Sequence, residues 1–361
     1  MAQSPHLHAP WWNPDVFSER RSYLRQRQKI TAAMRRFFTH NGFEEVETPI
    51  LQISPCMEPH VHAFGTRMRE PFDPGPGEPL YLHTSPEFAM KKLLVAGVPK
   101  LFQLAHVFRN AERSRTHHPE FLMLEWYRAH AGYGDLIEDC IGLLRATARA
   151  LGKSRIEWRG HVCHVFEEWE RLTVCEAFER YADIDLMQHV GTDPHQPDPA
   201  VLAGEAERIG IRVAADDSWE DIVLRILGER IEPHLGLAHP TVLMDYPISM
   251  AALSRPKPRD PRLAERFELY VCGLELANAF GELIDPEQQR ARFSADMDLR
   301  ERLYGDRYPV DQDFLAALEH GMPPSAGIAL GFDRLVMLLT GAGSIDDVLW
   351  CPVASVSLPQ A

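Results

Sequence analysis

The chain has 361 residues, with 38 Lys and Arg against 52 Asp and Glu, so its formal charge is −14. An apolar fraction of 45% is typical of a folded protein with a core and excludes a disordered chain. No apolar run approaches the ~18 residues of a membrane span, and the first residues lack the pattern of a signal peptide, so a cytoplasmic protein is expected. The acidic balance also disfavours unspecific binding of nucleic acid, which needs a basic surface.

Helices and strands are expected to follow one another without a repeated β-α-β unit. Residues 1–17 are expected to form an N-terminal arm and residues 18–361 one domain. The phosphate-binding motifs GxGxxG and GxxxxGK[ST] do not occur, so a Rossmann or P-loop site is not expected. In the first part of the chain, periodicity and capping residues predict a helix over 18–40, an extended stretch over 43–52, a strand over 80–85, a helix over 86–97, strands over 100–110 and 121–129, and a helix over 135–151. Residues 152–240 are expected to have mixed structure. After them we expect strands over 241–246 and 268–283, helices over 287–304 and 312–320, a strand over 327–331 and a helix over 334–340.

The first block of interest, residues 42–51 (GFEEVETPIL), follows the helix predicted over 18–40. Ile30, Met34 and Phe38 contribute to an apolar stripe on that helix. Gly42 is typical of the end of a helix, and Pro49 is tolerated better at the edge of a sheet than inside it. Taken alone, this block indicates little about function.

The second block comprises residues 108–112 (FRNAE), a basic loop, and residues 118–127 (HPEFLMLEWY). Side chains alternate along a strand, so Phe121, Glu125 and Tyr127 are expected on one face, opposite a strand that ends in Arg109. That face offers an aromatic ring, a carboxylate, a phenol and a guanidinium for an adenine, an ammonium group and a phosphate. A sheet face buried under a helix is the alternative, but it leaves the carboxylate of Glu125 unexplained.

The third block is residues 326–334 (AGIALGFDR). Gly327, Ala329 and Gly331 share one face of the predicted strand, and small residues there make a floor on which a planar ligand can approach the backbone. Close packing of a helix on the strand is the alternative. Arg334 follows, where its planar guanidinium can stack on a base or reach a phosphate.

In this order and at these spacings, the three blocks resemble motifs 1, 2 and 3 of the class II aminoacyl-tRNA synthetases, in particular the lysyl branch. Residues 275–283 (ELANAFGEL) are similar to the lysyl-type segment Glu-x-x-Asn-Gly-Phe-x-Glu-Leu, and residues 84–87 (TSPE) to its amino-acid-binding turn. The resemblance implies an α+β fold, the class II aminoacyl-tRNA synthetase catalytic fold, with a mainly antiparallel sheet flanked by helices. Because motif 1 is the dimer motif, it also implies a homodimer.

Within that branch the chain most resembles the elongation factor P–(R)-β-lysine ligase family. Motif 1 begins near residue 42, so no anticodon-binding OB-fold domain is expected, and Ala329 in the middle of motif 3 agrees with that family. The resemblance implies an ATP-dependent ligase that adenylates (R)-β-lysine, or lysine, and transfers it to a lysine side chain of elongation factor P. ATP and Mg²⁺ are therefore expected ligands, whereas tRNA and a membrane are not expected partners.

The resemblance also implies roles for individual residues. Arg109 is expected to bridge the substrate carboxylate and the α-phosphate of ATP, and Arg334 to hold the far side of ATP, so these two are the expected catalytic residues. Phe121 is expected to stack on adenine. The other implied ATP-binding residues are Asn110, Ala111, Arg115, His117, His118, Glu275 and Leu276, with a solvated loop as the alternative for Arg115 and His117. The implied amino-acid-binding residues are Ser85, Pro86, Glu87, Glu125, Tyr127, Asn278 and Glu282.

Glu275 and Glu282 are the expected Mg²⁺ ligands, because carboxylate oxygens suit this hard cation. They lie seven residues apart, so a regular strand would direct them to opposite faces. A bulge or turn near residues 277–279 is therefore expected.

Several positions depart from the family pattern: Ala111 stands where synthetases place Glu, with Glu112 next to it, and His118, Leu122 and Ala279 replace the usual Asn, Thr and Gly. Two other functions stay open. One is a minimal lysyl-tRNA synthetase, and the other is a catalytically inactive paralogue that acts as a regulatory binding module.

Overall fold

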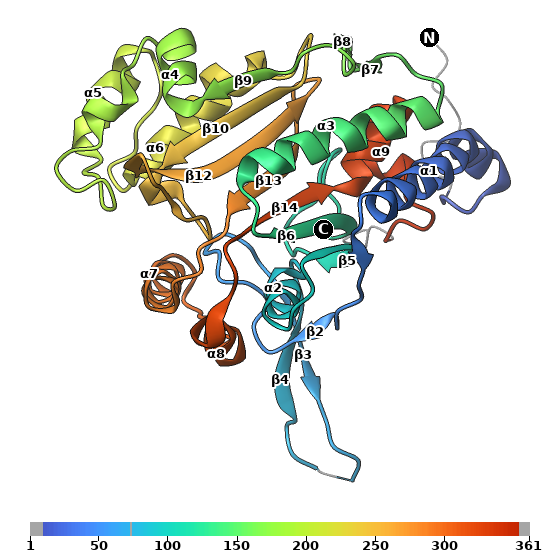
Figure 1. Ribbon diagram of the computed structural model, residues 1–361, viewed down its shortest axis with the longest axis horizontal. Helices are drawn as coiled ribbons and strands as arrows, with labels where there is room; N and C mark the ends of the chain where they lie inside the picture. The colour runs from blue at the N-terminus through green and yellow to red at the C-terminus, as the bar shows by residue number, and fades with distance from the viewer. Residues whose placement is uncertain (1–9, 73, 354–361) are drawn as a thin grey trace, which may run out of the picture.

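The computed structural model of the protein describes residues 10–72 and 74–353. Its centre is a nine-stranded sheet in the order β1-β5-β6-β14-β13-β12-β10-β9, with β11 paired to β12 (Figure 1). The bounds of these strands are β1 (Glu44–Glu45), β5 (Lys100–Phe108), β6 (Glu120–Ala129), β9 (Glu170–Thr173), β10 (Thr241–Pro247), β11 (Pro256–Lys257), β12 (Asp260–Val271), β13 (Leu274–Gly281) and β14 (Ser325–Gly331).

The pairings inside the sheet are antiparallel, and only the two outermost pairs, β1 with β5 and β9 with β10, run parallel. This arrangement confirms the predicted α+β fold with a mainly antiparallel sheet. The strands that carry the second and third sequence blocks, β6 and β14, are direct neighbours, with Glu125 opposite Ala329. Residues 200 positions apart in the chain are thereby brought side by side.

One face of the sheet is covered by three helices, α1 (Pro14–His40), α3 (Tyr133–Ala150) and α9 (Phe332–Thr340) (Figure 1). The predicted apolar stripe of α1 is buried in this layer, where the ring of Phe38 stacks on Phe102 at a centroid distance of 4.6 Å. Leu124 and Trp126 of β6 belong to the same core. Because side chains alternate along a strand, the odd-numbered residues of β6 are left for the opposite face.

Helix α1 begins at Pro14, four residues before the predicted start, because the side chain of Asn13 caps it by accepting a hydrogen bond from the Asp15 amide at 2.9 Å. The expected N-terminal arm over residues 1–17 is therefore too long at its inner end. Its residues 1–9 lie outside the described part of the chain.

The opposite face of the sheet is flanked by α2 (Glu87–Val95), α7 (Pro286–Tyr304) and α8 (Gln312–Gly321), which pack together around Phe88, Phe293 and Phe314. A small sheet of β2 (Leu51–Gln52), β3 (Phe64–Met68) and β4 (Glu78–Leu82) adjoins them, and its β3–β4 hairpin reaches away from the body (Figure 1).

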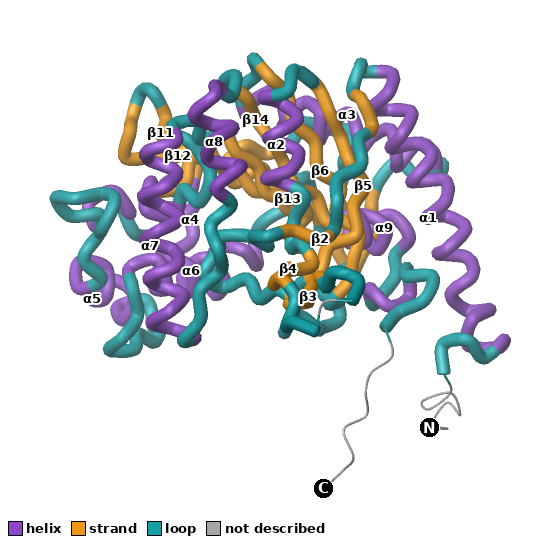
Figure 2. Tube along the Cα trace, turned by 90° about the horizontal axis from the view of Figure 1, so that it is seen from below, coloured by secondary structure: helices purple, strands orange, loops and turns teal. Residues whose placement is uncertain are grey.

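The stretch over 152–240, for which the sequence predicts only mixed structure, forms the hairpin of β7 (Ile156–Trp158) and β8 (His161–Cys163) and then a helical cluster. The cluster contains α4 (Val174–Ala182), α5 (Ala200–Arg208) and α6 (Trp219–Ile226), packed around Trp219 at the β9–β10 edge of the sheet. Figure 2 shows this cluster and α1 at opposite ends of the molecule. None of the described helices is both long and apolar enough to cross a membrane.

Candidate active site

A cavity of about 240 Å³ lies over the face of the sheet formed by β6, β13 and β14. Phe121, Met123, Glu125 and Tyr127, the odd-numbered residues of β6, all line it, as the alternation of side chains predicts. The loop between β5 and β6 closes one side, and the segment before α2 closes another. The second and third sequence blocks therefore form one site.

Glu125 lies at the inner end of the cavity and is completely buried. Its carboxylate accepts hydrogen bonds from the Ser85 hydroxyl at 2.7 Å and from the Tyr127 hydroxyl at 2.9 Å. Burial, followed by the nearby negative charge of Glu87, raises the pKa of Glu125 to about 8. A carboxylate kept out of water without a cation partner is suited to receive the ammonium group of a ligand.

Two further glutamates, Glu87 and Glu282, share a buried lysine, Lys91. Its ammonium group contacts Glu87 one helical turn before it, and lies 2.5 Å from a carboxylate oxygen of Glu282. Burial acts to lower the pKa of Lys91, but Glu282 and Glu87 outweigh it and raise that pKa. Burial raises the pKa of Glu282 to about 7 despite Lys91. Lys91 thus pairs with two of the three glutamates, and the inner end of the cavity gains a surplus of negative charge once all three are ionised.

Gly327 of β14 makes room for this arrangement. A Cβ atom built there would lie 2.2 Å from Cε1 of Tyr127 and 2.3 Å from Oε1 of Glu282. A residue without a side chain is therefore required at position 327, because the Tyr127 ring and the Glu282 carboxylate meet over the strand there. The flat floor that the sequence predicts exists, but at Gly327 the protein's own side chains occupy it.

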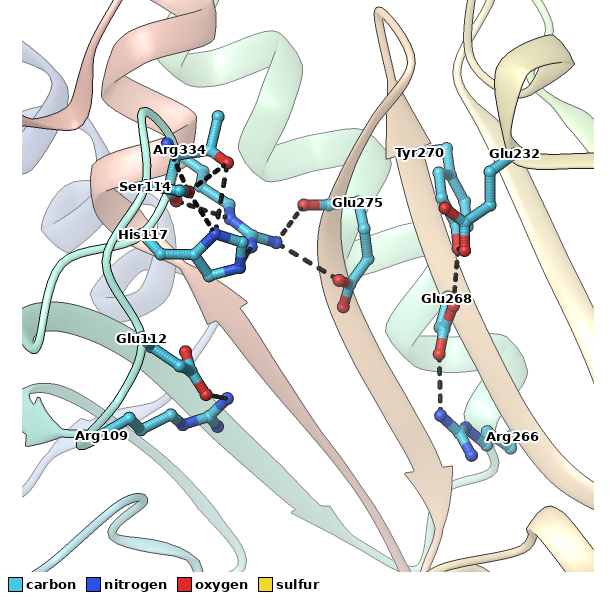
Figure 3. A network of polar contacts seen from close by, with 11 residues as sticks. Arg109, Glu112, Ser114, His117, Glu232, Arg266, Glu268, Tyr270, Glu275 and Arg334 are labelled. Carbon is cyan, nitrogen blue, oxygen red and sulfur yellow. Dashed lines mark hydrogen bonds and ion pairs between the residues drawn. The ribbon is translucent and has the colours of Figure 1, made fainter. Parts of the chain in front are cut away.

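At the outer end, Arg334 in the first turn of α9 joins three segments of the chain (Figure 3). Its guanidinium donates to the backbone carbonyl of Glu275 at 2.8 Å, to the side chain of Glu275 at 3.3 Å, and to Nε2 of His117 at 2.7 Å. Because arginine only donates, Nε2 of His117 is unprotonated, and Nδ1 donates to the Ser114 hydroxyl at 2.8 Å. Burial and the charge of Arg334 lower the pKa of His117.

Arg109 follows the end of β5 and lies between the two ends of the cavity. Its guanidinium carbon is 5.7 Å from the centroid of the Phe121 ring, and Nη1 is 4.0 Å from the carboxylate of Glu112. Ala111 adopts a left-handed conformation with φ of 63° and is exposed, whereas Glu112 lines the cavity. The turn at Ala111 thus brings the following glutamate to the arginine, which accounts for the displaced glutamate of motif 2.

The predicted bulge in β13 exists and lies one position before the predicted residues. Leu269 pairs with Ala277 and Tyr270 pairs with Glu275, so Leu276 is the extra residue. The bulge changes the alternation of β13, and Glu275 consequently lines the same cavity as Asn278 and Glu282.

The expected pairing of Glu275 with Glu282 around one metal ion stays a prediction, although both carboxylates line the same cavity. In this structure Glu282 is engaged by Lys91. A better neighbour of Glu275 is Glu268 on β12, whose charge, after burial, raises the pKa of Glu275.

Within residues 10–72 and 74–353, no group of three or more His, Cys, Asp or Glu side chains is arranged to hold a metal ion. Glu268 accepts from Arg266 at 2.7 Å and from Tyr270 at 2.8 Å, which fixes its carboxylate beside β13 (Figure 3). Two carboxylates from adjacent strands fit a Mg²⁺ ion that draws its remaining ligands from water and substrate phosphates, the usual arrangement for that ion.

Comparison with known proteins agrees with this geometry. The family model of the class II tRNA synthetases (D, K and N) matches residues 13–355. The chain belongs to this family. As a class II synthetase of the D, K and N group, it is an ATP-dependent amino-acid ligase.

Two kinds of named relative are similar to this synthetase. The elongation factor P–(R)-β-lysine ligases of Haemophilus ducreyi and Pectobacterium carotovorum subsp. carotovorum are each 38% identical to it over 90% of the chain, covering 92% and 93% of their own lengths. The lysine–tRNA ligase of Pelotomaculum thermopropionicum is 37% identical over 94% of the chain, which spans only 64% of that relative.

Most residues predicted for the site of this synthetase line the cavity. The exceptions are Pro86, Asn110, Ala111 and Arg115. Pro86 is the N-cap of α2 and not its first residue, and the Ser85 hydroxyl accepts from the Glu87 amide at 3.0 Å. His118, which also lines the cavity, is buried, and its Nε2 accepts from the Val353 amide at 3.2 Å.

The sequence reading missed several residues that build the site. Lys91 was not recognised because a lysine four residues after Glu87 on a helix normally forms an exposed ion pair, although that spacing was the available signal. Glu58 and Thr116 also line the cavity and lie outside the motif positions described above, whereas Phe280 lies within the lysyl-type segment but had no expected role. For Glu268 the sequence predicted only a place in the strand over 268–283.

Proposed function

We propose that this synthetase adenylates (R)-β-lysine, or lysine, and transfers it to a lysine side chain of elongation factor P in the cytoplasm. Two relatives named for that reaction cover nine-tenths of the chain and are themselves covered almost completely. The proposal draws its chemical support from the two ends of the cavity, one acidic and one basic.

The observation that carries the proposal is the surplus of carboxylates at the inner end. Lys91 pairs with Glu87 and Glu282, whereas Glu125 is held by the hydroxyl groups of Ser85 and Tyr127, so the carboxylates outnumber the ammonium group that they contact. A substrate with two ammonium groups and one carboxylate, the latter bound at Arg109, would bring the count of charges to balance. An amino acid with an apolar or acidic side chain would leave buried carboxylates without a partner, which is costly.

Adenylation needs placement and charge stabilisation more than acid–base help, since the substrate carboxylate is already a nucleophile. Arg109 is positioned between the amine end and the ATP end, so it can hold the carboxylate against the α-phosphate. Arg334 and His117 would bind the outer phosphates, and Phe121 would stack on adenine. A Mg²⁺ ion at Glu275 and Glu268 would neutralise phosphate charge.

The second step is attack of the acceptor amine on the adenylate carbonyl, which gives an amide and AMP. An amide survives mild base, whereas an aminoacyl ester on tRNA does not. Product stability therefore separates the two kinds of acceptor independently of their identity.

The test is ATP–pyrophosphate exchange with lysine and with (R)-β-lysine, followed by transfer of labelled amino acid to elongation factor P and to tRNA in parallel reactions. Absence of amino-acid-dependent exchange would indicate an inactive paralogue. Base-labile label on tRNA, formed at least as fast as label on elongation factor P, would favour the lysyl-tRNA synthetase function named for the Pelotomaculum relative.

A further inference from the structure

A second and smaller cavity, of about 40 Å³, opens beside the first. Its walls come from the segment between β2 and β3, the turn before α2, the stretch after β10 and helix α7. The two cavities share Glu58, Ser85, Glu87 and Arg109. They therefore meet at the arginine that is positioned to hold the reacting carboxylate, and the second cavity reaches it without crossing the ATP end.

The walls of the second cavity combine apolar surface with two carboxylates from separate elements. Met57, Phe88 and Leu253 contribute apolar side chains, while Glu58 and Asp296 contribute the carboxylates. Among the described residues, neither of these carboxylates accepts a hydrogen bond or lies within ion-pair distance of a cation. Burial and then the charge of Glu58 raise the pKa of Asp296 to about 7.

The nearest guanidinium on the same helix is already committed. Arg292 donates through Nη1 to the backbone carbonyls of Ala252 at 2.8 Å and Ser254 at 2.7 Å. These bonds fix the wall that carries Leu253 and leave Asp296 facing the cavity. The cavity thus offers a lining for a methylene chain and two free acceptors for an ammonium group, the half-buried Asp296 and the exposed Glu58.

We propose that this second cavity is the acceptor site, an inference that rests on the proposed function. It takes up the lysine side chain of the modified protein and places its ammonium group between Glu58 and Asp296. The apolar wall accommodates the four methylene groups of lysine, and the carboxylates attract its charge. The substrate's own ammonium groups are served by Glu87, Glu125 and Glu282, so the second pair of carboxylates is available for a different amine.

The acceptor must lose a proton before it can react. Asp296 takes that proton from the ammonium group, and the neutral nitrogen then attacks the carbonyl carbon of the adenylate. The new C–N bond forms, the C–O bond to phosphate breaks with its electron pair going to AMP, and the second proton leaves the nitrogen for solvent. A positioned carboxylate base of this kind typically contributes ~10²–10⁴-fold in rate.

The test separates the two half-reactions in the Asp296→Asn variant. Pyrophosphate exchange should stay within about twofold of the wild type in both kcat and the KM of the amino acid, while single-turnover transfer from the adenylate to elongation factor P falls by at least ~10²-fold. Asp296→Glu should recover much of the transfer rate. Asp298→Asn, on the exposed face of the same helix, removes the same charge and should change neither reaction.

Hydroxylamine supplies a further control, because it is largely neutral near pH 7 and needs no base. Asp296→Asn should form the hydroxamate from the adenylate at the wild-type rate, which also shows that the variant is folded. Either of two results in Asp296→Asn would overturn the acceptor site and leave the proposed function standing. One is an unchanged transfer rate, and the other is a rise in the KM of the amino acid by the same factor as the fall in the transfer rate. Absence of label on elongation factor P with the wild-type protein would overturn the proposed function as well.

Discussion

Binding of a diamino acid should release protons from the inner end of the cavity. Glu125 and Glu282 have pKa values of about 8 and about 7, both raised chiefly by burial. At pH 7 the first is about nine-tenths protonated and the second about half protonated. An ammonium group placed within hydrogen-bond reach lowers the pKa of a carboxyl by roughly 1–3 units, so binding should expel roughly one proton in total.

Isothermal titration calorimetry measures this number directly. Lysine is titrated at pH 7 into the protein in buffers of different ionisation enthalpy, and the slope of the observed heat against that enthalpy gives the protons released. Glu125→Gln should bind more weakly and release about half as many protons. Glu157→Gln, an exposed glutamate of β7, is the matched control and should behave like the wild type.

Two results would refute this reasoning. Equal heats in all buffers would mean that the glutamates are already ionised in the free protein. Undiminished release in Glu125→Gln would mean that the protons come from another group.

The direction of the pKa shift of Glu125 is also testable through stability. A carboxyl whose pKa is raised from 4.5 to about 8 holds its proton more tightly in the folded state than in the unfolded state. The free energy of unfolding should therefore fall as pH rises from 4.5 to about 8, by roughly 5 kcal/mol at most.

Three further changes test the site and its support. Arg109→Ala should slow pyrophosphate exchange by ~10²–10³-fold with the fold intact, because the charge at the α-phosphate loses its main partner, and near-normal exchange would contradict the assignment. Gly327→Ala should raise the KM for lysine at least ~10-fold by driving the new methyl group against Tyr127, with an unchanged far-ultraviolet spectrum, and an unaltered KM would argue against the packing described. Arg27→Met should lower the free energy of unfolding in urea by ~3–5 kcal/mol, because it leaves the buried carboxylate of Asp333, which lies 2.5 Å from Arg27, without its cation. A loss below ~1 kcal/mol would show that the ion pair contributes little.

Local patterns were sufficient for much of the fold. The alternation of β6 predicted which side chains line the cavity, because period-two geometry leaves no freedom once the strand is recognised. The stripe on α1 predicted its buried face in the same way. The start of α1 was missed because it depends on one capping side chain, Asn13, and the helical cluster around Trp219 carries no motif that distinguishes its elements.

The site was predictable where its residues fall in known motifs and not where pairing decides their role. The contact of Glu282 with Lys91 could not be predicted, because Lys91 comes from another element and only the fold brings the two side chains together. Glu268 was overlooked for the same reason: its closeness to Glu275 depends on the register of β12 with β13. Roles set by cross-strand neighbours need the register, which a single sequence does not supply.

The extra residue at Leu276 divides β13 into two parts, and the alternation of side chains in one part does not depend on the alternation in the other. Loss or gain of one residue here would change the direction of the side chains before it, while Asn278 and Phe280 keep their pairing with β14. Deleting Leu276 would therefore turn Glu275 away from the nucleotide end without moving the amine end. A strand divided in this way lets the side chains at the nucleotide end change direction while the amine end stays in place, so the two ends of the site can evolve separately.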